Sequence, residues 1–412
     1  MVVRWRRIIK KWIPGIISGG ADNDPSGIAT YSISGAQFGY NQLWLLILST
    51  PMLISVQAMC GRLGDVKKKG LMMIIREHYA PAIAILASVV LIITNTATLG
   101  ADIAGMADAF GLVTKTSFMW WVLPLSVRLW YVIVFKNFKI IERYLFGLSF
   151  VFFAYIVSGI LAKPDWGKVL VSIVHPTTSF TLEYFVAATG LLGTTITPFL
   201  FFWQARQGVE EHQKTQELTL EAKREDARVA PGFIYSNVIS LFIMISTAAV
   251  IHAGGAKGIV TAADAARGLE PIAGPLSKYV FAFGIIGAGL MAIPVLATST
   301  AYAVAETFGW RESLSDAVSR ARGFYAVISA TMVFGVLVAI SGVPPMIALL
   351  YSQVLNGILG PILVVLIILM CNDQKIMGRF VNRWFDNVFG WITVVTMVLG
   401  STGMFWQLVF RK

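Results

Sequence analysis

Apolar runs long enough to cross a lipid bilayer recur along the whole of this 412-residue chain. A helix needs about 20 consecutive apolar residues to span the hydrocarbon. Of the residues, 56% are hydrophobic and only 13% are charged, with a mean hydropathy of +0.72. Soluble domains carry roughly 25% charged residues, so we expect an all-α polytopic membrane protein.

The apolar runs end at clusters of Gly, Pro and charged residues, and these boundaries predict eleven transmembrane helices. The start of the chain is basic and leads into the first run without a small-residue cleavage site, so we expect a retained first helix. The predicted spans cover approximately residues 12–38, 42–62, 82–110, 118–135, 145–162, 186–206, 231–253, 275–306, 323–341, 346–371 and 387–408.

The basic residues alternate from one side of these spans to the other. With the N-terminus inside, 24 of the 33 Lys and Arg residues fall on inner segments, eight fall on outer segments, and Arg128 lies within the fourth span. Because Lys and Arg are retained on cytoplasmic loops, this pattern supports the span count, with the N-terminus in and the C-terminus out. It also accounts for the net charge of +11 without a nucleic-acid partner.

Two of the predicted spans are broken near their middle by polar residues and a proline. The first contains GGADNDPSGIATY, with Pro25, and the sixth contains TGLLGTTITPF, with Pro198. Proline removes a backbone donor and clashes with the preceding turn, and flanking Gly or Ser is expected to let the chain unwind. Irregular backbone at membrane depth persists only inside protein or beside a wet cavity. The two breaks are therefore the expected place for a substrate.

One break follows the other after five spans, so the second group of five runs through the membrane in the opposite sense. This spacing predicts a 5+5 inverted repeat, with the substrate between the two discontinuous helices. We expect a single transport domain over residues 1–412, with repeats at about 12–162 and 186–371 and an extra helix at about 387–408.

The first break holds two acids, Asp22 and Asp24, with Asn23 between them. An aspartate at the centre of a membrane helix costs ~2.5–3.5 kcal/mol on insertion scales, so such acids are functional candidates by default. We expect Asp24 above all, and then Asp22, to contact a cation. Either can also cap the half-helix that follows, because Asp is a favoured N-cap residue.

Two other spans carry polar side chains on one helix face. Such a stripe either faces the bundle interior or a water path, or it hydrogen-bonds to a neighbouring helix, and both alternatives stay open here. The residues are Asn95, Thr98 and Asp102 in the third span and Ser352, Gln353 and Asn356 in the tenth.

The stretch DPSGIATYSISGAQFGYNQLWLL, residues 24–46, resembles the first-helix motif of the natural resistance-associated macrophage protein (Nramp) metal transporters. Shorter similar strings follow in order: RLGDV, ADIAG, FKIIERY, PDWGKVL and LLYSQV. The resemblance covers nearly the whole chain. It implies a LeuT-type inverted-repeat fold with discontinuous helices 1 and 6, and import of a divalent metal together with a proton.

The departures from the family pattern concern its metal ligands. The family's first-helix ligands are the aspartate and asparagine of D-P-G-N; Asp24 matches the aspartate, but Gly27 stands at the asparagine position. In the sixth helix the family shows A-x-x-M-P-H. Here Thr194, Thr197 and Phe199 replace the alanine, the methionine and the histidine.

These replacements predict a site made of oxygen ligands. A thioether helps a site to hold transition metals, whereas Mg²⁺ takes oxygen ligands and parts reluctantly with its water. Gly27 is expected to enlarge the cavity, and Asp22 to add attraction that acts through water. We therefore expect a transporter of Mg²⁺, with Mn²⁺ as a competitor, similar to the Nramp-related magnesium transporter branch.

The proton-coupling residues of the family are also incomplete. The histidine is replaced by Phe199, and of an acidic pair in the third helix only Asp102 remains. We expect uptake without a proton, driven by the membrane potential, from which a divalent ion gains ~4.6 kcal/mol per 100 mV. The expected setting is a prokaryotic cell membrane, with a monomeric protein, no obligatory protein partner and no cofactor apart from the transported Mg²⁺ or Mn²⁺.

The candidate residues fall into two groups. The expected metal-contacting residues are Asp24, Thr197, Thr194, Gly27, Asp22, Asn23 and Gln353, and the pathway candidates are Asp102, Thr98, Asn95, Asn356 and Phe199.

Several alternative functions stay open at this point. One is a proton-coupled Mn²⁺ or Fe²⁺ importer, and others are a trivalent-cation carrier or an amino-acid symporter of similar fold. A non-transporting, Nramp-like signalling scaffold would carry a large soluble C-terminal domain, whereas this chain stops at WQLVFRK. An enzyme is disfavoured because HExxH and GxSxG motifs are absent from the sequence.

Overall fold

The computed structural model describes residues 19–20, 22–135, 152–212, 225–255, 258–312 and 318–410, and in these ranges it is helical with no strand. The main helices are α2 (Pro25–Phe38), α3 (Leu43–Lys67), α4 (Leu71–His78), α5 (Pro81–Thr114), α6 (Met119–Phe135), α8 (Phe153–Leu161), α9 (Trp166–Val174), α10 (Leu182–Thr195), α11 (Pro198–His212), α13 (Glu225–Thr247), α14 (Ala262–Ala266), α15 (Glu270–Ala273), α16 (Ser277–Phe308), α17 (Arg322–Ala339), α18 (Pro345–Asn372), α19 (Gln374–Met377) and α20 (Trp384–Phe410). A π-helical turn, η2 (Ala248–His252), extends α13.

The predicted spans correspond to these helices. Within the described ranges, eight helical segments are long and apolar enough to cross a membrane, and α6 is a shorter apolar helix. α2 and α8 lie within the first and fifth predicted spans, of which residues 12–18, 21 and 145–151 lie outside the described residues. The all-helical membrane architecture is thus confirmed, while the count of eleven and the orientation of the termini stay predictions.

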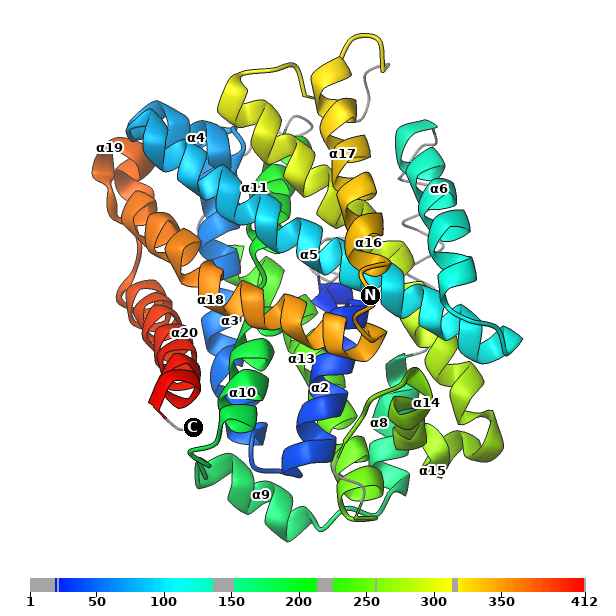
Figure 1. Cartoon of the computed structure of the whole chain (residues 1–412). Coiled ribbons are helices and arrows are strands. Elements are labelled where there is room, and N and C mark those ends of the chain that lie inside the picture. The colour runs from blue at the N-terminus through cyan, green and yellow to red at the C-terminus, as the bar shows by residue number, and fades with distance from the viewer. Residues whose placement is uncertain are drawn as a thin grey trace, which may run out of the picture.

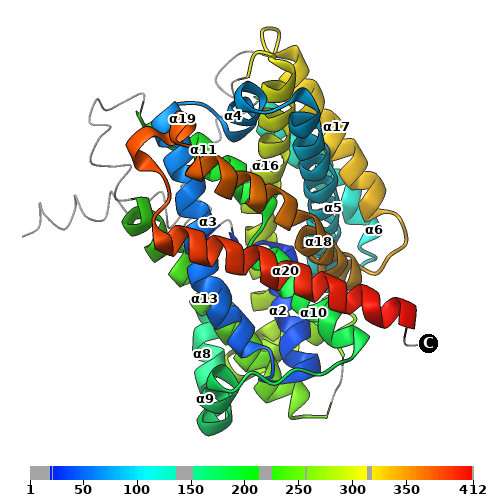
Figure 2. The ribbon, with the colours of Figure 1, turned by 90° about the vertical axis from the view of Figure 1, so that its left-hand side faces the viewer.

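Segments predicted to share a side of the membrane lie at the same end of the bundle. The short helices α4 and α19, from two predicted inner loops, lie together at one end, and α9, from a predicted outer loop, lies at the opposite end (Figures 1 and 2). In Figure 1, α14 and α15, from another predicted outer loop, also lie at the end with α9. The alternation of basic loops therefore matches the arrangement of the chain in space.

Both predicted breaks are present. Gly19, Gly20 and Asp22 are helical, the chain is irregular at Asn23 and Asp24, and α2 then begins at Pro25. The Asp24 side chain accepts a hydrogen bond from the Gly27 N–H, so this residue is the N-cap of α2. Proline at the first helical position is favourable because its missing N–H has no intrahelical partner there.

The sixth span breaks later than the glycines suggested. α10 continues through Gly190 and Gly193 to Thr195, and only Ile196 and Thr197 separate it from α11. The helix does not unwind at these glycines. They instead allow neighbouring helices to pack closely against α10. A Cβ atom on Gly193 would collide with the backbone of Gln353 in α18, and small residues of this kind let membrane helices approach closely.

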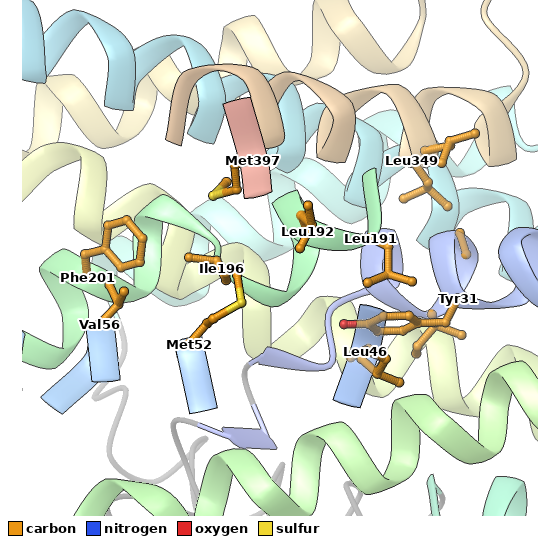
Figure 3. Packing of buried hydrophobic residues seen from close by; sticks show 14 of the residues in the cluster. Tyr31, Leu46, Met52, Val56, Leu191, Leu192, Ile196, Phe201, Leu349 and Met397 are labelled. Atoms are coloured by element: carbon orange, nitrogen blue, oxygen red, sulfur yellow. The ribbon is translucent and has the colours of Figure 1, made fainter. Parts of the chain in front are cut away.

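The break in the sixth span is enclosed by apolar side chains. Ile196 is buried in the main hydrophobic cluster together with Met52 of α3 and Met397 of α20. Figure 3 shows these side chains around the irregular segment between α10 and α11, with Leu192 beside them. The break therefore persists inside protein, as an unwound membrane segment must.

A charge cluster anchors α11 at the end of the bundle predicted to be cytoplasmic. Nη1 of Arg206 lies 2.9 Å from Oε1 of Glu312 and 3.9 Å from Oε1 of Glu306, at the end of α16. Glu306 also accepts hydrogen bonds from the backbone N–H groups of Met72 and Met73 in α4. Burial raises the pKa of Glu312, although the adjacent Arg206 favours its charged form. The cluster thereby joins α11, α16 and α4.

A buried ion pair joins the last helix to the bundle. Both terminal nitrogens of Arg62 in α3 donate to Oδ2 of Asp386 in α20 at 3.0 Å, and Arg62 also donates to Asn382 at 2.6 Å. The two charged side chains are 6% and 0% exposed. Removing one partner of such a pair leaves an uncompensated buried charge, which costs about 3–5 kcal/mol.

We therefore expect Arg62→Ala to lower the free energy of unfolding by about 3–5 kcal/mol. The matched control is Lys69→Ala, which removes an ion pair with Glu77 whose side chains are 40% and 38% exposed and which is worth about 0–1 kcal/mol. Thermal unfolding of the detergent-solubilised variants measures both effects. Equal shifts for the two variants would contradict the structural importance of the buried pair.

Candidate cation site

The two breaks meet at Gly27, in the first turn of α2. A Cβ atom placed on Gly27 would lie 2.8 Å from Oγ1 of Thr194 in α10 and 3.0 Å from Oδ1 of Asp24. Asp24 is 2% exposed and Thr194 is 1% exposed. The structure thus brings together three of the predicted metal-contacting residues, from two different helices, around one buried position.

The space beside Gly27 differs from the expectation of an enlarged cavity. The missing side chain does not leave the position open, because the Thr194 hydroxyl and the Asp24 carboxylate lie against it. In this structure, the absence of a side chain at Gly27 lets the Thr194 hydroxyl oxygen lie close to the Asp24 carboxylate. Glycine at position 27 therefore does not by itself create open volume in this structure, and the oxygen ligands stay a prediction.

Asp102 of α5 joins this group through Ser26. Its Oδ1 accepts hydrogen bonds from the Ser26 N–H at 3.1 Å and from the Ser26 hydroxyl at 2.6 Å. Ser352 of α18 donates to the same serine hydroxyl at 3.3 Å. Ser26, which the sequence did not single out, thus links the third, tenth and first spans. Its signal was its place within the polar break.

The other residues of the two polar stripes point to different neighbours. Asn356 of α18 donates to Thr98 of α5 at 3.2 Å and to Gln353 at 2.8 Å. Asn95 instead donates to Thr300 of α16 at 2.9 Å. Asn95, Thr98 and the amide nitrogen of Asn356 therefore form hydrogen bonds between helices, which is one of the two alternatives left open for these stripes.

Asp22 and Asn23 form a separate polar group with α13. Ser236 donates to Oδ2 of Asp22 at 2.6 Å and accepts from the Asn23 amide at 3.0 Å. Ser240, one turn further along, donates to Oδ1 of Asn23 at 3.5 Å. Neither serine was among the predicted site residues, although their i, i+4 spacing within an apolar span was a detectable signal.

Thr197 and Phe199 flank Pro198 at the second break and are 2% and 1% exposed. Phe199 packs in a hydrophobic cluster with residues of α5 and α16. Its ring supplies no proton-exchanging group at the position where the family has histidine.

Several buried polar atoms of the candidate residues have no hydrogen-bond partner among the residues that the structure describes. Because buried polar atoms are nearly always satisfied, these atoms are available to a ligand or its water. They are Oδ1 of Asp22, Oδ2 of Asp102, Oγ1 of Thr194, Oγ1 of Thr197, Nε2 of Gln353 and Oδ1 of Asn356.

The electrostatics of the site favour a cation. The carboxyl groups of Asp22, Asp24 and Asp102 are all buried, and Asp102 is hydrogen-bonded to Ser26, two residues after Asp24. Among the described residues, these carboxyl groups accept hydrogen bonds from hydroxyl and backbone groups of Ser26, Gly27 and Ser236. The last turn of α10 also lies here, since Thr194 is next to Gly27, and a helix C-terminus carries partial negative charge.

The arrangement does not resemble a chelating metal centre. Within the described ranges, no three His, Cys, Asp or Glu side chains gather in a group that can hold a metal ion. The two cysteines, Cys60 and Cys371, are free and buried. A cation here would be met by carboxylate, hydroxyl and carbonyl oxygens from several helices, which is the ligand chemistry of a hard cation.

Comparison with known proteins identifies the family. A family model described as natural resistance-associated macrophage protein-like (Nramp) matches residues 15–407. The chain belongs to the Nramp family. It is 28% identical over 389 residues to the divalent metal cation transporter MntH of Klebsiella pneumoniae (strain 342), which covers 94% of this chain and 90% of that protein.

Solved structures agree on the fold of this Nramp protein. A manganese transporter from Eremococcus coleocola, in complex with an aromatic bis-isothiourea substituted compound, is similar with a TM-score of 0.76 and 18% identity, covering 99% of this chain and 89% of that one. The nucleobase-cation-symport-1 family transporter Mhp1, closed with bromovinylhydantoin bound, has a TM-score of 0.61 and 14% identity, covering 97% and 93%. The predicted LeuT-type fold and multi-pass membrane location are confirmed.

We expect Asp24→Asn to abolish metal binding while leaving α2 intact, because Asn caps a helix about as well as Asp but carries no charge. Asp24→Ala removes the charge and the cap together and is expected to abolish transport as well. Metal uptake into proteoliposomes and the metal-dependent shift of the unfolding temperature measure the effect. Near-normal uptake by the folded Asp24→Asn protein would exclude this carboxylate from the site.

Proposed function

We propose that this Nramp protein imports divalent metal cations by alternating access, with Mg²⁺ as the preferred ion and Mn²⁺ as a competitor. Transport of divalent metal is supported by the similarity to MntH, which spans nearly the full length of both chains. The observation that carries the choice of Mg²⁺ is the meeting of the Asp24 carboxylate and the Thr194 hydroxyl at Gly27. Both are oxygen ligands, which Mg²⁺ takes in preference to sulfur or nitrogen.

The ion is proposed to keep part of its water. Mg²⁺ usually retains several waters and contacts only one or two carboxylates directly. Asp22 belongs to the same break and accepts a hydrogen bond from Ser236 through Oδ2. Its Oδ1 has no hydrogen-bond partner within the described residues. It can therefore attract the ion through a bridging water, and Asp102 can do so on the α5 side. Thr197, Gln353 and Asn23 complete the proposed set of contacts.

Transport is proposed to proceed without a coupled proton. The position of the family's histidine holds Phe199, which is buried in an apolar cluster. Asp102, the acid that remains of the family's pair in the third span, is hydrogen-bonded by Ser26 at the start of α2. That contact gives it a role in positioning the first break. The membrane potential alone supplies ~4.6 kcal/mol per 100 mV to a divalent cation.

A second candidate substrate class is Mn²⁺ taken up with a proton, as in a soft-ligand Nramp importer. One observation favours it: Met106 of α5 lies near Pro25 at the start of α2, since both side chains approach Gly289. A thioether near the break offers a ligand of the kind that selects transition metals. The transport experiment below separates this possibility from the main proposal.

The deciding experiment is transport by the purified protein in proteoliposomes supplied with Mg²⁺, Mn²⁺ or Ca²⁺, with internal pH recorded at the same time. We expect Mg²⁺ to enter, Mg²⁺ to compete with Mn²⁺, and internal pH to stay constant during uptake. Failure of Mg²⁺ both to enter and to compete would refute the Mg²⁺ proposal. Internal acidification in proportion to Mn²⁺ uptake would replace it with the proton-coupled importer.

We expect Thr197→Met to raise the ratio of Mn²⁺ to Mg²⁺ uptake several-fold, because it adds a soft ligand at the second break. Thr197→Val is the control, since it removes the same hydroxyl without adding sulfur. Competition between the two metals in proteoliposomes measures the ratio. An equal change of the uptake ratio in both variants would show that the sulfur atom of methionine does not select Mn²⁺.

A further inference from the structure

We propose that a cavity at the end of the bundle predicted to face outward, here called the outer cavity, binds the phosphate group of an anionic phospholipid. The outer cavity has a volume of about 810 Å³ and lies between the end of α2, the linker 162–165 with the start of α9, and η2. It is separate from the candidate cation site, which lies at the start of α2. The proposal therefore does not depend on which ion the protein carries.

The charged side chains that line the outer cavity are mainly basic. Lys163, Lys168 and His252 can carry positive charge, whereas Asp165 is the one acid among the described lining residues. The Asp165 carboxylate is already engaged, because it accepts the Lys168 N–H at 3.1 Å and lies 3.3 Å from the Lys168 ammonium. An excess of positive charge around a cavity raises the local concentration of anions. The lining therefore favours an anionic ligand.

The outer cavity touches two helices that are firmly joined to each other. Nδ1 of His252, at the end of η2, donates to the Ala36 carbonyl of α2 at 3.0 Å, and its ring lies against Gly39, where a Cβ would be 3.2 Å from Nε2. One turn earlier, a Cβ on Gly35 would collide with the backbone of Met244 in α13. A ligand in the outer cavity therefore contacts α2 and the end of α13 at their junction, and its binding stabilises the folded protein.

The apolar surroundings favour a lipid over a soluble anion. The rest of the lining is largely apolar and includes Phe38 and Val171. α9 lies at the end of the bundle where α2 ends (Figure 1), and it exposes Trp166, Leu170 and Val174 although it belongs to a predicted loop. Exposed apolar side chains beside basic ones are typical of a helix that lies in the membrane interface. An acyl chain can follow these apolar side chains while the phosphate meets the lysines.

The simplest competing explanation is that Lys163 serves only the end of α8. It follows the C-cap residue Ala162 with a φ of 49°, and a basic residue there interacts favourably with the helix dipole. Lys115 has the same left-handed conformation at the end of α5, with a φ of 58°. It is predicted to lie on the same side of the membrane and does not line the outer cavity. Lys115→Gln is therefore the matched control.

The experiment titrates the purified full-length protein in detergent with dioctanoyl-phosphatidylglycerol, and the rise in unfolding temperature reports binding. Glycerol phosphate supplies the phosphate without acyl chains, and dioctanoylglycerol supplies the chains without a phosphate. We expect phosphatidylglycerol to stabilise the protein at a much lower concentration than either partial probe. Equal potency of glycerol phosphate would overturn the lipid in favour of a soluble phosphate ester. Equal potency of dioctanoylglycerol would overturn the role of the phosphate.

Two sets of variants test the charges with opposite expected signs. We expect Lys163→Gln combined with Lys168→Gln to raise the half-maximal phosphatidylglycerol concentration about tenfold, which corresponds to about 1.4 kcal/mol, while Lys115→Gln leaves it unchanged. Asp165→Asn should lower it several-fold, because asparagine still caps α9 but no longer repels the phosphate. A purely structural role of these residues would not produce tighter binding.

Three results would overturn the proposal. The first is a wild-type protein that phosphatidylglycerol does not stabilise. The second is a loss of response in Lys115→Gln as large as in the double lysine variant, which would reveal a general attraction between basic side chains and anionic lipid. The third is weaker binding by Asp165→Asn. If the double lysine variant does not unfold cooperatively without lipid, the sign of the Asp165→Asn effect decides.

Discussion

Backbone polar groups have no water to bond with inside the hydrocarbon, and the architecture of this protein follows from that constraint. Two helices are broken at membrane depth, so their free ends have to be satisfied by other parts of the protein. Side chains of the first break itself and of α5 do this, while apolar side chains enclose the second break. Asp24 caps α2, Ser26 is held by Asp102, and Ile196 is enclosed by apolar side chains.

The acids at the first break, and the acid of α5 that is bonded to it, also determine the electrostatics of the candidate site. Three carboxyl groups, on Asp22, Asp24 and Asp102, are buried at the first break or hydrogen-bonded to it, each with hydroxyl or backbone donors. Charged carboxylates in a low-dielectric region repel one another strongly, and a bound divalent cation would relieve that repulsion. The same residues that end and cap the half-helices are thus arranged to attract the proposed substrate, so the break and the site have one physical origin.

The fold was largely predictable because its signals are local. Apolar runs of sufficient length, interrupted by Pro25 and Pro198, located the spans and both breaks, and the basic loops agree with the ends of the bundle to which α4, α19 and α9 belong. The role of the glycines in the sixth span was mispredicted. Gly193 remains helical because α18 packs against it, and no local pattern reveals the partner of a glycine.

The sequence by itself predicted Asp24 as a ligand, and its resemblance to the family pointed to the hydroxyl-bearing replacements at positions 194 and 197 and to Phe199 in place of the histidine, because residue type decides ligand chemistry. Only the tertiary structure decided which of these side chains meet. In the structure, Thr194 lies against Gly27, Asp22 is hydrogen-bonded to Ser236 of α13, and Asn95 is hydrogen-bonded to α16. The reason is that contacts between side chains of different helices depend on how each helix is rotated about its axis and how closely it approaches its neighbours. Backbone contacts between residues far apart in the chain, such as Gly193 with Gln353, set those quantities.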